Sequence, residues 1–113
     1  MKNANRGISH EEYLIEQLKD PEYAAAYLSE LFKDSDDGAQ ERILVGLHRM
    51  AKAHGISNIT GRLGLSPAAL FRALSPNGNP RMGTLLGVLR EMGLSLKAVP
   101  QKVPRQRRLK RAV

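Results

Sequence analysis

One glycine between two short apolar repeats constrains the fold of this chain more than any other feature. Gly64 follows the segment Ser57 to Leu63, in which Ile59 and Leu63 lie four residues apart. After it come Leu65 and the segment Ser66 to Ser75, with apolar residues again three or four apart. Glycine tolerates the positive φ of a sharp turn. The pattern therefore predicts two short helices joined by a tight turn, a helix-turn-helix unit; an unrelated helical bundle whose short helices meet at Gly64 is the alternative.

Helix signals surround this unit on both sides. A capping-box pattern at Ser9 and the pair Asp20-Pro21 predict the starts of two N-terminal helices, and the pair Ser66-Pro67 predicts a cap at the start of the second short helix. Apolar residues recur at helical spacing over residues 39–53 and 81–92, and these stretches predict two further helices. The expected fold class is therefore all-α, a helix-turn-helix bundle with two N-terminal helices.

The end of the chain differs in pattern from the rest. Leu94 to Val99 alternate between apolar and other residues, which allows one short strand that would pair with its copy in a dimer. The chain then divides into acidic N-terminal helices over 1–38, a helix-turn-helix DNA-binding domain over 39–99 and a basic tail over 100–113, which we expect to be flexible and disordered.

Charge follows the same division. Residues 1–40 carry four Lys or Arg against nine acids, residues 41–99 carry eight against two, and residues 100–113 carry six and no acid. The net charge is +7. A basic region attracts polyanions, so nucleic acid is an expected partner. A basic protein that binds nothing specific is the alternative.

Several classes of function are disfavoured by what the chain lacks. It has no cysteine, and no apolar run approaches the ~18 residues of a membrane span. His48 and His54 lie six residues apart and leave one helical face, so no metal site is expected. We expect a cytoplasmic protein without a cofactor, and no enzyme, because no catalytic constellation is present.

A family pattern covers about two thirds of the chain. Its most specific part is Arg72 to Pro80, a loop that most repressor folds lack, and other matching runs are Tyr27-Leu28, Gly64-Leu65-Ser66, Thr84-Leu85-Leu86, Val88-Leu89 and Gly93-Leu94. In these residues the chain resembles the addiction-module antidote protein family, the HigA-type antitoxins with a lambda-repressor/Cro-like helix-turn-helix. The resemblance implies an antitoxin that binds a RelE/ParE-like toxin and represses its own promoter. The acidic front helices would suit a basic toxin through Glu11, Glu12, Glu16, Glu22 and Glu30.

Candidate DNA contacts lie in the two short helices and the loop that follows them. Arg72 could reach a guanine or a phosphate, and Asn58 could bond DNA or serve as a helix cap, although Ser57 has the better cap position. The full candidate set is Ser57, Asn58, Arg62, Ser66, Pro67, Ala68, Phe71, Arg72 and Asn79. One such unit covers only a few base pairs, so a homodimer on double-stranded DNA is expected.

The start of the second short helix departs from the family pattern. Members commonly have Arg where this chain has Pro67 and Gln where it has Asn58, and a small Ala is usual where it has Thr60. The run Ser66 to Ala69 offers few groups able to read base edges. A protein-interaction module with a helix-turn-helix fold that no longer reads DNA specifically is therefore the second hypothesis.

Overall fold

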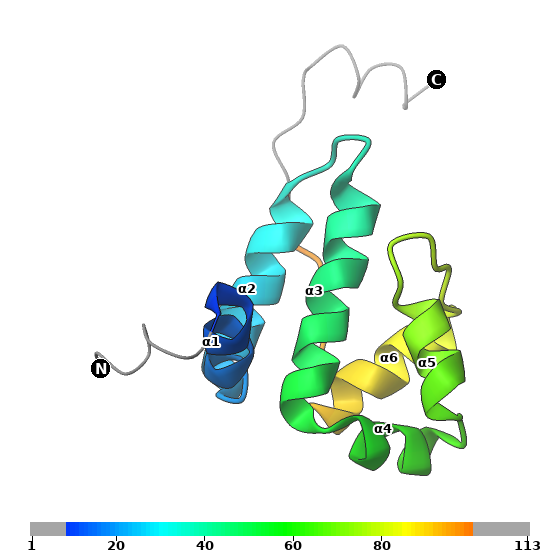
Figure 1. Cartoon of the computed structure of the whole chain (residues 1–113). Helices are drawn as coiled ribbons and strands as arrows, with labels where there is room; N and C mark the ends of the chain where they lie inside the picture. The colour runs from blue at the N-terminus through cyan, green and yellow to red at the C-terminus, as the bar shows by residue number, and fades with distance from the viewer. Residues whose placement is uncertain (1–8, 101–113) are drawn as a thin grey trace, which may run out of the picture.

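The computed structural model describes residues 9–100, which form six α-helices and no strand (Figure 1). The helix α3 lies in the middle, with α1 and α2 on one side and α4, α5 and α6 on the other. Within these residues the expectation of an all-α fold is confirmed. The helices are α1 (His10–Gln17), α2 (Pro21–Lys33), α3 (Ala39–His54), α4 (Ile56–Leu63), α5 (Pro67–Ala73) and α6 (Met82–Glu91).

Side chains cap three of these helices where the sequence predicts. The Ser9 hydroxyl accepts a hydrogen bond from the Glu12 amide at 3.1 Å, and the Glu12 carboxylate accepts one from the Ser9 amide at 3.0 Å. Asp20 caps α2 and Ser66 caps α5, and each is followed by a proline in the first turn. These caps satisfy amides that have no partner within the helix. The starts of α1, α2 and α5 are therefore set by local sequence.

A single hydrophobic core joins both sides of α3. The N-terminal helices contribute Leu18, Ala24 and Leu28 to the same buried cluster that the other helices build. Gly46 on α3 lets α2 approach closely, because a Cβ there would meet the side chains of Leu31 and Tyr27. The largest fully buried side chains are Leu47, Met50, Ile59, Leu70, Leu74, Val88 and Leu89.

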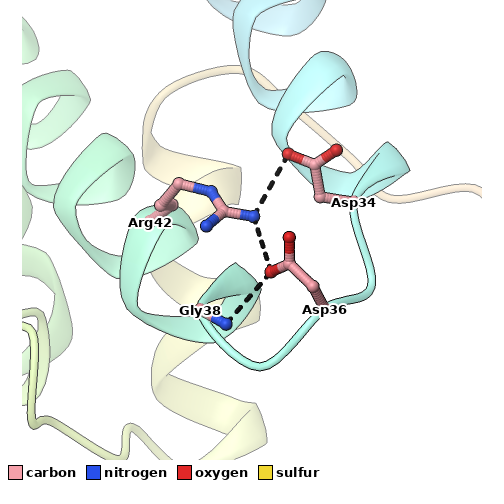
Figure 2. A network of polar contacts seen from close by, with 4 residues as sticks. All are labelled: Asp34, Asp36, Gly38 and Arg42. Carbon is pink, nitrogen blue, oxygen red and sulfur yellow. Dashed lines mark hydrogen bonds and ion pairs between the residues drawn. The ribbon is translucent and has the colours of Figure 1, made fainter.

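The connection between α2 and α3 is held by a polar network (Figure 2). One guanidinium nitrogen of Arg42 lies 2.8 Å from Asp36 Oδ1 and 3.3 Å from Asp34 Oδ2. The same Asp36 oxygen accepts a hydrogen bond from the Gly38 amide at 3.0 Å. The hydrogen bond from Arg42 holds the pKa of the Asp36 carboxyl below its usual value. The network therefore orders the loop at neutral pH, although its groups are exposed and screened by water.

A second network ties α1 and α2 to α3. The Arg49 guanidinium donates from Nε to both carboxylate oxygens of Glu11 at 3.0 Å, and from a terminal nitrogen to the Tyr27 hydroxyl at 3.1 Å. This hydrogen bonding lowers the pKa of Glu11 and raises that of Arg49. Because α1 has no buried residue within its own span, Arg49 is one of its main anchors.

The short strand that the sequence allows at Leu94 to Val99 is not found among the described residues. Residues 94–100 have no regular secondary structure, and in Figure 1 they run behind α3. The Leu94 amide donates instead to the Leu89 carbonyl at 2.8 Å, and the Leu94 side chain packs on the core. Residues 95–99 have no partner strand within residues 9–100. The expectation of a flexible basic tail falls almost entirely on residues 101–113, which lie outside the described residues.

Candidate nucleic-acid interface

The turn between α4 and α5 has the backbone that the sequence predicts. Gly64 adopts φ 68° and ψ 29°, in the left-handed region, and its amide donates to the Thr60 carbonyl. The Leu65 amide donates to the same carbonyl at 3.1 Å, and its half-buried side chain packs on the core. Two successive amides thus close the end of α4 before Ser66 starts α5.

The helices α4 and α5 each expose four residues at the same spacing along the helix. On α4 these are residues 57, 58, 61 and 62, and on α5 they are residues 67, 68, 71 and 72. This spacing places each set on one face of its helix. All nine residues of the candidate set are exposed, and eight of them lie on these faces or in the turn: Ser57, Asn58, Arg62, Ser66, Pro67, Ala68, Phe71 and Arg72. Asn79, the ninth, lies in the loop after α5.

The start of α4 differs from the expectation in one respect. Its N-cap is Gly55, with φ 111° and no capping side chain, so Ser57 is not the cap. The side-chain amide of Asn58 lies close to Gly55, since a Cβ on Gly55 would be 2.8 Å from the Asn58 Nδ2 atom. Thr60 is buried, and its hydroxyl donates a hydrogen bond to the Ser57 carbonyl at 3.5 Å.

The stretch of sequence that forms this surface contains no carboxylate that could pair with its arginines. No Asp or Glu occurs between Glu41 and Glu91, a stretch that includes all of α4 and α5. Arg62 is 74% exposed, with its Nε 3.8 Å from the Glu91 carboxylate, which is a weak contact. Arg72 is exposed and makes no ion pair within residues 9–100. The surface therefore presents two cations and no adjacent chain anion except Glu91.

The loop after α5 is packed directly against the end of that helix. A Cβ on Gly78 would meet the backbone carbonyls of Ala73 and Arg72, so no other residue fits without a shift. The Gly78 amide donates to the Ser75 carbonyl at 2.8 Å, and the Ser75 hydroxyl donates to the Arg72 carbonyl at 2.9 Å. These contacts fix the exposed Asn79 beside the C-terminal end of α5.

His48 is a contact of this site that the sequence does not single out. Its ring centroid lies 5.0 Å from that of Phe71, with 65° between the ring planes. Its Nε2 is buried and has no hydrogen-bond partner among residues 9–100. Burial lowers the pKa of His48, and the cation Lys52 lowers it further. The sequence feature that could have indicated its inward position is its place on the apolar stripe of α3, four residues after Leu44 and three before Ala51.

Residues 9–100 contain no group of three metal-ligating side chains close enough to hold an ion. Over the same range, no helix is long and apolar enough to cross a membrane. A shallow groove lies next to the candidate surface, between the end of α4 and the start of α6. Its lining residues are Leu63, Leu65, Arg81, Gly83 and Thr84.

Comparison with known proteins adds two findings. Residues 10–100 match the model of a family described as "Probable addiction module antidote protein". An uncharacterized protein of Haemophilus influenzae is similar to this chain, with 32% identity over 84 residues that cover 74% of this chain and 84% of that protein. No solved structure matches the chain.

Proposed function

This chain belongs to the family of probable addiction module antidote proteins, and from that premise we propose that it is the antitoxin of a type II toxin–antitoxin module that also represses its own promoter. The family implies a toxin partner in general. The observation that carries the DNA-binding half of the proposal is the surface of α4 and α5, which is exposed, contains two arginines and has no adjacent acid except Glu91.

In this proposal α4, the turn at Gly64 and α5 act as a lambda-repressor-like helix-turn-helix. The helix α5 enters the major groove, where Arg72 contacts a guanine or a phosphate, while Arg62 on α4 contacts the backbone. A helix of seven residues covers only a few base pairs. The proposed species on DNA is therefore a homodimer on paired half-sites.

The toxin partner is proposed to be RelE/ParE-like and to bind the side of α3 that carries α1 and α2. A toxin that holds RNA must be basic, and this side holds most acids of the chain. Several of those acids are already paired within the chain: Glu11 with Arg49, Glu16 with Lys19, and Glu30 with Lys33. Among the front acids, Glu22 is exposed and makes no ion pair within residues 9–100. It is the residue to test first.

A protein-interaction module that no longer reads DNA is the second candidate. The observation that favours it is the exposed start of α5, where Pro67 and Ala68 carry no hydrogen-bonding side chain. In addition, residues 9–100 hold ten Lys or Arg against eleven Asp or Glu, so the described part is not basic overall. Such a module would bind a protein partner with little dependence on nucleic-acid sequence.

Fluorescence anisotropy with DNA from the gene's own promoter separates the two candidates. A repressor binds this DNA more tightly than unrelated DNA, and its affinity falls steeply as salt rises, because phosphate contacts release counterions. Absence of binding at low salt would remove the repressor half and leave the interaction module.

The antitoxin half is tested separately with the product of the neighbouring gene. The charge reversal Glu22→Lys should weaken that complex about tenfold, since like charges across an interface repel. Glu22→Gln should have a smaller effect, and both variants should bind promoter DNA as the wild type does. Unchanged toxin affinity in Glu22→Lys would place the toxin on another face.

A further inference from the structure

The orientation of α5 depends on a small number of contacts. It spans seven residues, and isolated helices of this length are unstable in water. Leu70 and Leu74 hold it from below in the core, and the loop at Gly78 closes its end. The contact that reaches its exposed face comes from α3, where His48 meets Phe71.

Phe71 directly precedes Arg72, and both are exposed on α5. The Phe71 ring is 38% exposed, so one part of it faces water while another lies against His48. A movement of α5 that separates this ring from His48 would also move Arg72, the next residue of the same helix. The His48–Phe71 pair is the one aromatic pair among residues 9–100, so no second ring would keep Phe71 in place.

We propose that His48 is a positioning residue for the recognition surface, whose neutral imidazole holds Phe71 and with it α5, and whose protonation loosens α5. This inference rests on the proposed DNA-binding function. It assigns to acid pH a weakening of DNA binding through α3, a helix that contributes none of the candidate DNA contacts.

The surroundings of His48 disfavour its charged form. Protonation places a charged N–H at the buried Nε2, which has no acceptor among the described residues. On α3 the neighbouring charges are the cations Lys52 and Arg49. From α1 the carboxylate of Glu11 opposes them, but it is already engaged by two hydrogen bonds from Arg49. The ionisable groups of α4 and α5 are arginines only, so neither helix offers an anion. Burial accordingly lowers the pKa of His48 from its ordinary 6.5.

The direction in which DNA affinity changes at acid pH distinguishes loosening of α5 from a simple gain of positive charge. Protonating any histidine adds positive charge, which alone strengthens binding to phosphates. Loosening α5 acts in the opposite direction, because the apparent affinity falls with the fraction of molecules in the binding-competent state. If about two thirds of the molecules are protonated and loosened, affinity falls roughly threefold.

The first experiment needs no DNA. NMR titration of the full chain should show His48 protonating below its ordinary pKa of 6.5. Hydrogen exchange of the α5 amides should accelerate at least several-fold as His48 protonates, after correction for intrinsic rates, while α2 and α3 stay protected. His48→Phe and His48→Gln should remove this acceleration, and His54→Gln should retain it. A pKa of His48 at its ordinary 6.5, or hydrogen-exchange rates in α5 that do not change as His48 protonates, would overturn the proposal.

The second experiment measures promoter affinity from pH 7.5 to 5.5 at fixed salt. The wild type and His54→Gln should weaken as His48 protonates, by roughly threefold at the pH where two thirds of the molecules are protonated, whereas His48→Phe and His48→Gln should stay level or tighten. Tighter binding of the wild type at acid pH would overturn the proposal, since an imidazolium over the Phe71 ring would then hold α5 at least as well. Absence of DNA binding at every pH would instead remove the proposed function, and the exchange experiment would still decide whether His48 holds α5.

Discussion

Glycines near α5 satisfy different physical demands, although they look alike in the sequence. Gly64 adopts a left-handed backbone with open space around it, so conformation alone selects glycine there. Gly78 has no positive φ, and the carbonyls of Ala73 and Arg72 exclude any Cβ. Gly61, on the exposed side of α4, meets neither demand. The pair Asn77-Gly78 is typical of turns, but here close packing against backbone, and not a positive φ, requires the glycine.

Gly78→Ala should lower the free energy of unfolding by about 1–3 kcal/mol, because a methyl group would be forced against backbone that cannot move away easily. Gly61→Ala is the matched control and should be neutral or stabilise by up to about 1 kcal/mol, since alanine is the better helix former. Urea denaturation of both variants measures the difference. Equal midpoints would show that the loop yields at Gly78 without cost.

Among the six described helices, α1 is held by the fewest buried side chains. Its own span has none, and its attachment relies on Leu14, on Leu18 at its end, and on the pair between Glu11 and Arg49. The pair is partly exposed, so its contribution is modest even with bidentate geometry. We therefore expect α1 to open before the other helices of the described chain.

A double-mutant cycle of Glu11→Gln and Arg49→Met should give a coupling of about 0.5–1 kcal/mol at pH 7. Because the pKa of Glu11 is lowered below its ordinary 4.5, this coupling is present above that pH and is lost as pH falls through the lowered pKa. Hydrogen exchange of α1 should accelerate in either single variant, with α4 and α5 unchanged. Zero coupling at pH 7 would mean that apolar contacts alone attach α1.

The elements also show how far local sequence reaches. The caps at Ser9, Asp20 and Ser66 depend on residues within three positions, and all three are found where predicted. The strand allowed at Leu94 to Val99 is not found in the described chain, because a strand needs a partner strand, which alternation alone cannot supply. The contacts of His48 with Phe71 and of Arg49 with Glu11 were missed for a related reason, since they join residues 23 and 38 positions apart in the sequence.

Across the whole molecule, the net positive charge comes from residues outside the range 9–100. Residues 9–100 carry ten cations against eleven acids, and the remaining eight cations belong to residues 1–8 and 101–113. Long-range attraction to DNA would then come from the ends of the chain, and recognition from α4 and α5. This division explains how the protein can have a pI near 10.1 although residues 9–100 are nearly neutral.

Deleting residues 101–113 should weaken promoter binding and reduce the slope of log affinity against log salt. Six cations are removed, and each phosphate contact contributes about 0.9 to that slope, so a loss of up to about five is the upper limit. Preference for the promoter over unrelated DNA should remain, and toxin binding should be nearly intact. If the slope stays the same, the tail makes no phosphate contacts.

A comparison of Arg72→Ala with Lys97→Ala on promoter and unrelated DNA tests directly whether α5 reads DNA. Each variant removes one exposed cation, but only Arg72 lies on α5. Arg72→Ala should cost roughly 1–3 kcal/mol on the promoter and relax preference at one base pair, while Lys97→Ala should reduce affinity slightly and equally on both DNAs. If Arg72→Ala instead loses affinity equally on both DNAs, as Lys97→Ala does, Arg72 contacts only the DNA backbone and α5 does not read a base through it.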